Sequence, residues 1–383
     1  MNNVGQPRMS LGLYLHVPFC HTRCHFCAFT IQIHREDRAQ RYLHALSGEM
    51  RLHAGQQSLA GRRLDTVYFG GGTPTALSPV QLLDVLRQVR ESFPMHDTAE
   101  ISVEAHPDTV TEDGLRQLVD AGVTRISFGA QSMDDSELIQ IGRRTSSDRT
   151  QTAVNMARTA GFANINLDLI YGVPGQTLDG WLATLEAVLS LEPTHVSTYA
   201  LTVEEKTRLH IDVRRGDAVE PDAALQNEME DAAAQRLATA GFTRYEISNY
   251  ARPGYACRHN LLYWQGHDYL GLGPSAQSYL NGRRFGNAES VEDYCQTLEE
   301  GRLPIAESEL LSEDQRQRER IVFGLRLVEG VDQALLRHEP PDRAWHQTLD
   351  RMTRRGLLEE RAGRIRLTDE GRRFADSVAV ELL

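Results

Sequence analysis

The sequence predicts an α/β protein in which parallel strands alternate with helices. Short β-rich runs recur through roughly the first 240 residues, and segments with apolar residues at helical spacing separate them. The expected strands span residues 11–17, 65–70, 100–104, 125–129, 164–171 and 195–200. Helical spacing is clearest at Leu82, Leu83, Leu86 and Val89 and at Leu182, Leu185, Val188 and Leu189. Six such units form a partial (β/α)6 barrel, and an open doubly wound sheet is the alternative.

The pattern changes beyond residue 304. Apolar residues at helical spacing, from Ile321 to Leu327, precede a helix that should end near Gly356. Two short strands at 357–360 and 364–367 and a last helix from Asp369 follow, an arrangement that resembles a winged-helix module. The nine arginines between residues 343 and 374 are interleaved with five acidic residues, which favours a solvated surface or a partner contact over nucleic acid.

Composition predicts a cytoplasmic protein. The chain has 383 residues, 40% of them apolar, enough for one large domain and a smaller one. We find neither a leading apolar segment of signal length nor a run of 18 apolar residues. The net charge of -12 argues against general adhesion to nucleic acid. Five cysteines, three of them crowded together, do not form an extracellular disulfide framework.

Those three cysteines, Cys20, Cys24 and Cys27, have the spacing C-x3-C-x2-C. A 4Fe-4S cluster takes thiolate ligands, normally four. Three thiolates on one loop can hold three irons and leave the fourth open to a small molecule. Zinc, a disulfide or incidental cysteines are the alternatives, but zinc usually takes four N or S ligands and the remaining cysteines, Cys257 and Cys295, are isolated.

In its context the cysteine motif resembles the radical S-adenosylmethionine (SAM) enzymes. The segment from Tyr14 to Cys20 resembles the entry strand of the oxygen-independent coproporphyrinogen oxidase group, whose branches include that oxidase (HemN) and the haem chaperone HemW. The resemblance implies a TIM-like radical SAM barrel whose open iron is chelated by SAM, with Phe26 beside the cluster. It divides the chain into a core at 1–255, an extension at 256–303 and a winged-helix-like domain at 304–383.

The same resemblance assigns residues that contact SAM. Ligands of parallel α/β folds bind at the carboxyl ends of the strands, and the glycine triplet before Thr73 and Pro74 lies at such an end and matches the family's GGTP-type motif. The implied SAM contacts are Tyr14, Phe26, Gly72, Thr73, Pro74, Glu104, Gln131, Arg143, Asp168 and Ala200. Arg144 is an alternative to Arg143. No catalytic residue is assigned.

Three features separate the branches of the group. Phe29 stands where the oxidase has a fourth cysteine, and only 19 residues precede Cys20, whereas the oxidase has a longer N-terminal extension. The third feature is the segment from His259 to Trp264, which resembles the HNxxYW motif of HemW-type chaperones, and the glycine-rich stretch 271–279 resembles the loop that follows it. Apart from these features, many relatives have Asp where this chain has Ala28, a local departure that leaves the cluster ligands unchanged.

Imidazole is a common ligand of haem iron, so His259 is the expected haem ligand. Tyr263 and Cys257 are alternatives, and the His-Asn pair is also suited to bracing the open side of the barrel.

The resemblance therefore implies a haem chaperone that binds a 4Fe-4S cluster and SAM. Its expected partners are haem and the respiratory enzymes that accept haem, membrane-associated ones among them. An electron donor such as flavodoxin or ferredoxin is expected if SAM is cleaved. No coproporphyrinogen oxidase activity is expected. The enzymatic alternative is a radical SAM methyltransferase or cyclopropanase of the same HemN-like group, and a zinc-binding structural protein is the third class.

Overall fold

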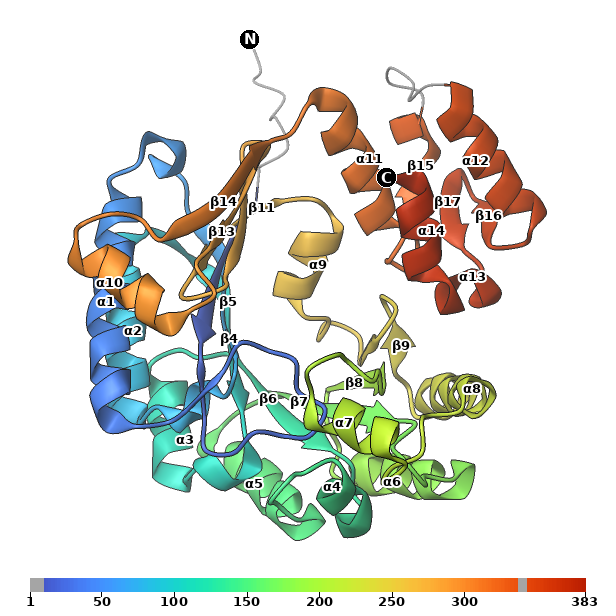
Figure 1. The fold of residues 1–383 in the computed structure, drawn as a ribbon, viewed down its shortest axis with the longest axis horizontal. Helices are drawn as coiled ribbons and strands as arrows, with labels where there is room; N and C mark the ends of the chain where they lie inside the picture. Colours follow the sequence, from blue (N-terminus) through green and yellow to red (C-terminus); the bar gives the residue numbers. More distant parts are fainter. Residues whose placement is uncertain (1–9, 337–342) are drawn as a thin grey trace.

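The computed structural model describes residues 10–336 and 343–383, and its centre is a 12-stranded mixed sheet (Figure 1). Six neighbouring strands run parallel to one another, as the sequence predicted. They are β1 (Leu11–Val17), β4 (Leu64–Gly71), β5 (Met95–Ala105), β6 (Arg125–Gln131), β7 (Asn164–Tyr171) and β8 (His195–Ala200). The helices between them are α1 (Glu36–Ala54), α2 (Pro79–Ser92), α3 (Glu112–Asp120), α4 (Asp135–Gln140), α5 (Ser147–Ala160) and α6 (Leu178–Ser190), and α7 (Arg208–Arg215) and α8 (Ala223–Thr239) follow β8.

The sheet curves as a barrel would but is not closed by hydrogen bonds, because β14 and β9 are its two edges. Beyond β1 it continues through β11 (Asp268–Leu272), β12 (Gln277–Leu280), β13 (Arg283–Asn287) and β14 (Ile305–Leu310), and beyond β8 through β10 (Asn249–Ala251) and β9 (Thr243–Arg244). Helix α9 (Arg258–Trp264) lies between the two arms of the curve (Figure 1) and contacts β1, β4 and β11. Helix α10 (Val291–Glu299) packs on α1.

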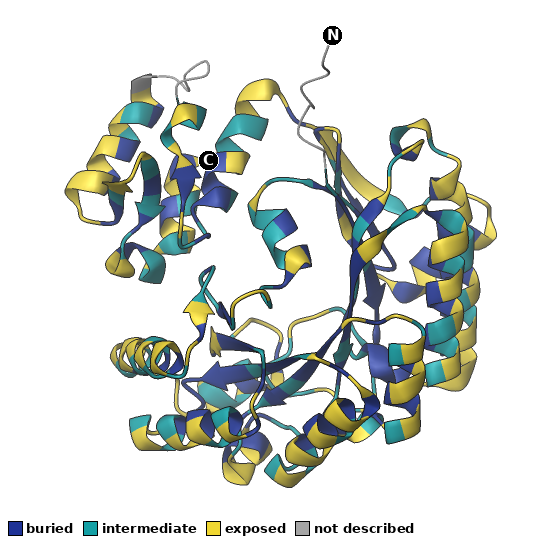
Figure 2. Cartoon of the chain, turned by 180° about the vertical axis from the view of Figure 1, so that it is seen from behind, coloured by how far each residue is buried: buried dark blue, intermediate teal, exposed yellow. Residues whose placement is uncertain are grey.

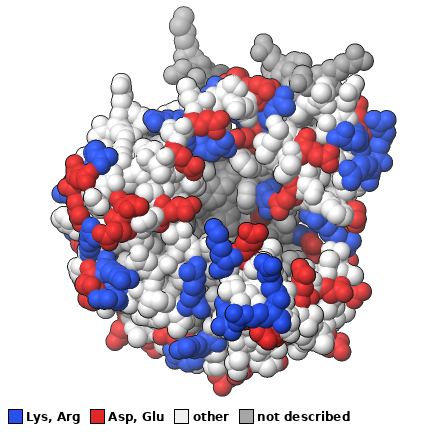
Figure 3. Space-filling model, viewed as in Figure 1, with Lys and Arg blue, Asp and Glu red and all other residues white. Residues whose placement is uncertain are grey.

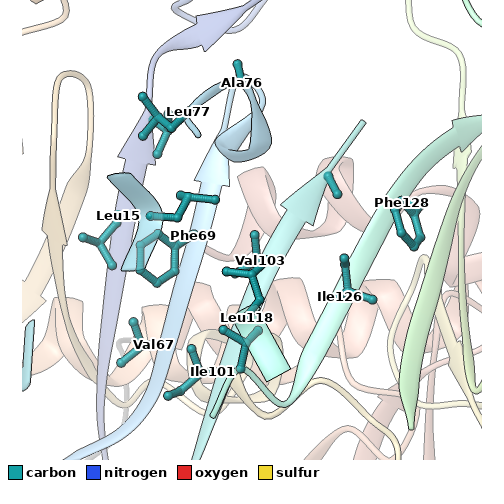
Figure 4. Close-up of a cluster of buried hydrophobic side chains, with 14 of the residues drawn as sticks. Leu15, Val67, Phe69, Ala76, Leu77, Ile101, Val103, Leu118, Ile126 and Phe128 are labelled. Atoms are coloured by element: carbon teal, nitrogen blue, oxygen red, sulfur yellow. The ribbon is translucent and has the colours of Figure 1, made fainter. Parts of the chain in front are cut away.

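Alternate residues of the parallel strands face opposite sides. One set is apolar and buried under the helices, as Leu15, Phe69, Val103 and Phe128 show in Figure 4. The other set is polar and faces the concave side, where Tyr68, Glu104, Arg125, Ser127, Asn166, Asp168 and Ser197 line one cavity. The concave side of the sheet therefore holds a polar cavity, while the apolar core lies between the sheet and its helices (Figure 2).

The C-terminal segment has its own hydrophobic cluster, which includes Ile321, Met352, Leu358 and Leu382. Its elements are α11 (Glu313–Gly324), β15 (Val331–Asp332), α12 (Arg343–Arg354), β16 (Leu358–Arg361), β17 (Arg364–Leu367), α13 (Asp369–Arg373) and α14 (Ala375–Leu382). The sheet here has three strands rather than the two expected, because the two-residue β15 pairs with β17. None of the helices described is long and apolar enough to cross a membrane.

Candidate functional site

A cavity of about 690 Å³ opens at the carboxyl ends of the parallel strands. Its volume is in the range of sites for small molecules and cofactors. Its rim is formed by the cysteine loop and the glycine triplet, and its floor by the inward-facing residues of β5 to β8. Acidic and basic side chains are mixed over the face shown in Figure 3, which is hollowed at its centre.

Backbone hydrogen bonds fold the cysteine loop back on itself. Strands β2 (Phe19–Cys20) and β3 (Gln32–Ile33) pair in parallel at its base. The loop is then held against the barrel, because the backbone N–H of His25 donates to the carbonyl of Ile141 at 2.9 Å and that of Leu209 donates to the carbonyl of His25 at 2.8 Å. These contacts place all three cysteines of the motif on the cavity.

The thiols of this loop are free and fit a metal cluster with three protein ligands. Burial raises the pKa of Cys20 to about 11 and is also the main cause of the raised pKa of Cys27. Cys20 Sγ lies 3.3 Å from the hydroxyl of Thr73, and Arg143 donates to Cys24 Sγ at 3.7 Å. Metal binding deprotonates such thiols outright. In residues 10–336 and 343–383 no group of three or more His, Cys, Asp or Glu side chains is arranged as a metal site.

Most of the residues assigned to SAM from the sequence meet at this cavity. Those that line it are Phe26, Gly72, Thr73, Glu104, Gln131, Arg143, Asp168 and Ala200. Tyr14 and Pro74 are not among the lining residues. Tyr14 lies on β1, where its hydroxyl is 3.2 Å from Nδ1 of His16 and its ring stacks on that of Tyr68. Pro74 is buried at the first turn of the short helix that follows the triplet.

The two acidic residues assigned to SAM, Glu104 and Asp168, differ in their surroundings. Tyr68 donates to Glu104 at 2.9 Å, whereas Asp168 accepts hydrogen bonds from Ser127 and Asn166, each also at 2.9 Å. Burial, and next the charge of Asp168, raise the pKa of Glu104 to about 7. Glu104 therefore changes its charge near neutral pH.

The backbone at the end of β6 is unusual. Gln131 has a φ of 69°, and the pairing of β6 with β7 shifts its register between Gly129 and Gln131. Such a bulge re-aims a side chain, and left-handed backbone in a non-glycine residue is often found at functional sites. Here it turns Gln131 to the cavity lining.

Both adjacent arginines, Arg143 and Arg144, line the cavity, and they differ in their burial and contacts. The side chain of Arg143 is half-buried and donates to the carbonyl of Gly129 as well as to Cys24, while Arg144 is exposed. Arg143 therefore bridges the cysteine loop and the end of β6.

His259 is inside the protein and fully engaged. It is 1% exposed, its Nδ1 lies 2.7 Å from the hydroxyl of Thr66, and its Nε2 lies 2.8 Å from the hydroxyl of Tyr263. Burial, and then the charge of Arg125, lower its pKa to about 3. Of the two roles left open by the sequence, this arrangement favours bracing. The alternative ligand Cys257 is also fully buried.

Several cavity residues were not singled out from the sequence, among them Arg125, Ser127, Asn166 and Ser197. They follow a signal that was available, because polar residues alternate with apolar ones along β6, β7 and β8. Asn260 belongs to the HNxxYW-like motif on α9, and only the fold shows that it reaches the cavity.

Comparison with known proteins gives matches over the whole chain. Residues 14–188 match the radical SAM superfamily, and residues 311–374 match the HemN C-terminal domain. The chain is 38% identical to the haem chaperone HemW of Mycobacterium tuberculosis (strain CDC 1551 / Oshkosh), with 99% of this chain and 95% of the relative covered. It is 33% identical to the haem chaperone HemW of Bacillus subtilis (strain 168), with 95% and 97% covered.

The fold is similar to that of coproporphyrinogen III oxidase (HemN) from Escherichia coli, a radical SAM enzyme. The TM-score is 0.85 at 25% sequence identity, and the similarity covers 98% of this chain and 91% of that one. The similarity therefore includes the barrel, its extension and the C-terminal segment.

Proposed function

Because the chain belongs to the HemW family of radical SAM proteins, we propose that it is a haem chaperone that binds a 4Fe-4S cluster and SAM in the barrel cavity and delivers haem to other proteins. The observation that carries the proposal is the meeting of three free thiols with the strand-end residues around one cavity, in a chain that matches HemW relatives over almost its full length.

In this proposal Cys20, Cys24 and Cys27 hold the cluster. The glycine triplet, Glu104, Gln131, Arg143, Asp168 and Ala200 hold SAM, with Phe26 beside the cluster. Held by these three thiolates, the cluster would supply one-electron reduction of the bound SAM sulfonium. The chain's own residues bind and orient SAM and keep water from it. Phe26 takes part in this by packing against the apolar cluster around Leu138 and Ile170.

The raised pKa of Glu104 predicts that SAM affinity increases about tenfold from pH 6 to pH 8. With a pKa of about 7, only about a tenth of this carboxyl is ionised at pH 6, and the ionised form attracts the cationic SAM more strongly. Calorimetric titration of the reconstituted protein across this range measures the effect.

The matched control is Glu104→Gln, whose profile keeps only the titration of the SAM amino group. Equal pH dependence in both proteins would contradict the role of Glu104. The folding stability should depend on pH in the opposite direction to SAM affinity. The pKa of Glu104 is about 7 in the folded protein and about 4.5 in the unfolded chain, so the folded protein holds this proton more tightly. The free energy of unfolding therefore falls as the pH rises from 4.5 to 7.

The chaperone role also fits the residue at position 29, where the oxidase branch has a fourth cysteine and this chain has Phe29. Phe29 is 66% exposed on the cysteine loop and lines the cavity mouth with a side chain that cannot ligate iron. We propose that haem is cargo, that respiratory enzymes accept it, and that flavodoxin or ferredoxin is the electron donor when SAM is cleaved. Thiolates and a cluster of this kind suit a reducing compartment, so we place the protein in the cytoplasm.

Haem titration of the native protein tests the function, and His259→Ala tests the bracing role. We expect a Soret band in both proteins, because His259 has no free ring nitrogen. We expect the variant to lose about 2 kcal/mol of unfolding free energy, since Thr66 and Tyr263 lose a buried partner. Absorption spectra and urea unfolding measure the two effects.

Tyr263→Phe is the matched variant, because it releases Nε2 of His259 and keeps the ring. Loss of the Soret band in His259→Ala, together with tighter haem binding in Tyr263→Phe, would instead identify His259 as the haem ligand. Failure of the native protein to bind haem, combined with methyl transfer from SAM, would favour the alternative function, a radical SAM methyltransferase or cyclopropanase.

A further inference from the structure

Arg125 is a buried cation whose guanidinium makes no hydrogen bond or ion pair with a side chain of residues 10–336 or 343–383. It is the first residue of β6, its side chain is 2% exposed, and it lines the floor of the cavity. Its Nε and Nη1 atoms have no hydrogen-bond partner in the described part of the chain, and no ion pair joins it to a carboxylate of residues 10–336 or 343–383. Buried charges are normally paired, because an unpaired one is costly.

The carboxylates around Arg125 have hydrogen-bond donors of their own. Glu100 accepts from the backbone N–H groups of Arg258 and His259, both at 3.1 Å, and so caps the N-terminus of α9. Glu104 and Asp168 are held by the hydroxyl and amide donors described above. None of these carboxylates forms a hydrogen bond with Arg125, and its Nε and Nη1 atoms remain without a partner among the described residues.

Arg125 also lies well below the strand ends. It pairs in register with Ser102 and Asn164, whereas Gly129, four residues further along β6, pairs with Asp168 in the SAM row. At 3.3 Å per residue the two rows are about 13 Å apart. Between them the cavity wall carries the neutral groups of Ser127, Asn166 and the Asn260 contributed by α9, together with the carboxyl of Glu104, which pairs in register with Ser127.

We propose that Arg125 is the anion-binding group of a second ligand subsite, on the floor of the cavity beneath SAM, for an aliphatic carboxylate. A guanidinium binds a carboxylate through two parallel hydrogen bonds, and the orphaned Nε belongs to such a fork. The carboxylate comes either from a small free acid or from a propionate of haem. The proposal relies on the proposed function only for the ligand above the subsite.

The test uses the full chain, anaerobically reconstituted and saturated with SAM. Acetate is the probe, and chloride at equal ionic strength and pH is the reference. Native protein should bind acetate and show a higher thermal midpoint than in chloride. Arg125→Met should bind acetate at least about tenfold more weakly. Arg116→Met, which removes an exposed arginine from α3 far from the cavity lining, should behave as the native protein.

Two further experiments identify the source of the carboxylate and test the role of the guanidinium group. If haem binds native protein about tenfold more tightly than haem dimethyl ester does, and Arg125→Met removes the difference, the carboxylate is a propionate. Equal binding of haem and its ester, with acetate bound, assigns a free acid. Arg125→Lys keeps the charge without the fork and should bind acetate with intermediate affinity.

The proposal is overturned if acetate and chloride act alike on native protein, or if Arg125→Met retains acetate binding. It is also overturned if the thermal midpoint of Arg125→Met lies far below that of Arg116→Met, because so large a loss would mean that Arg125 belongs to an internal ion pair. Retention of SAM and cluster in these samples separates that failure from failure of the proposed function, in which SAM and haem would not bind.

Discussion

Replacing Cys20, Cys24 or Cys27 by Ala should abolish the 4Fe-4S cluster completely. Each thiol lies on the rim of the same cavity, and the loop offers no other sulfur to take its place. With only three protein ligands, loss of one leaves two, which is too few to hold the cluster. Iron and sulfide analysis after anaerobic reconstitution should give about four irons per chain in native protein and almost none in each variant.

Cys295→Ala is the control. This thiol is 2% exposed in the core against α1 and does not line the cavity. Its loss should leave iron content and visible absorption unchanged. A full cluster in Cys24→Ala would contradict the ligand assignment. One zinc per chain in place of iron in native protein would show that the cysteine motif is a zinc site.

The parallel strands could be predicted closely, because apolar residues recur at alternate positions in short runs that turn residues bound. The expected ranges for β7 and β8 coincide with Asn164–Tyr171 and His195–Ala200. β5 extends from Met95 rather than from residue 100, since its first residues are mostly solvent-accessible and carry no apolar signal. Strands β9 to β13 were not expected, because they are two to five residues long and depend on pairing with distant partners.

The motif residues of the site could be predicted because they follow one another along the strand ends in the same order as in the radical SAM family. The direction in which each side chain points could not be predicted. Glu104 and Asp168 line the cavity, whereas Tyr14 from the same set does not and stacks beside Tyr68. His259 shows the same limit, because an imidazole in a motif looks available for ligation until its hydrogen bonds to Thr66 and Tyr263 are known.

Gly72→Ala should lower SAM affinity by about a hundredfold, or about 2.7 kcal/mol. From the sequence, the triplet was expected to let a ligand approach the backbone. In the structure, a Cβ at Gly72 would also lie 2.8 Å from the carbonyl oxygen of Phe19 and 3.1 Å from its nitrogen. These are backbone atoms next to Cys20, so the first strand end and the cysteine loop must shift. The hydrogen bond from the N–H of Thr73 to that carbonyl, 2.7 Å long, would be strained.

Because Gly72 supports both the SAM wall and the loop that carries the first thiol, its substitution should also make the cluster labile. Calorimetric SAM titration and the rate of iron release to a chelator measure the two effects. Gly48→Ala on α1 is the matched control. Its added Cβ would meet nothing closer than Arg51 Nη2 at 4.0 Å, so it should raise helix stability by about 0.5–1 kcal/mol and leave SAM affinity unchanged. Native SAM affinity in Gly72→Ala would mean that the triplet serves only as a turn.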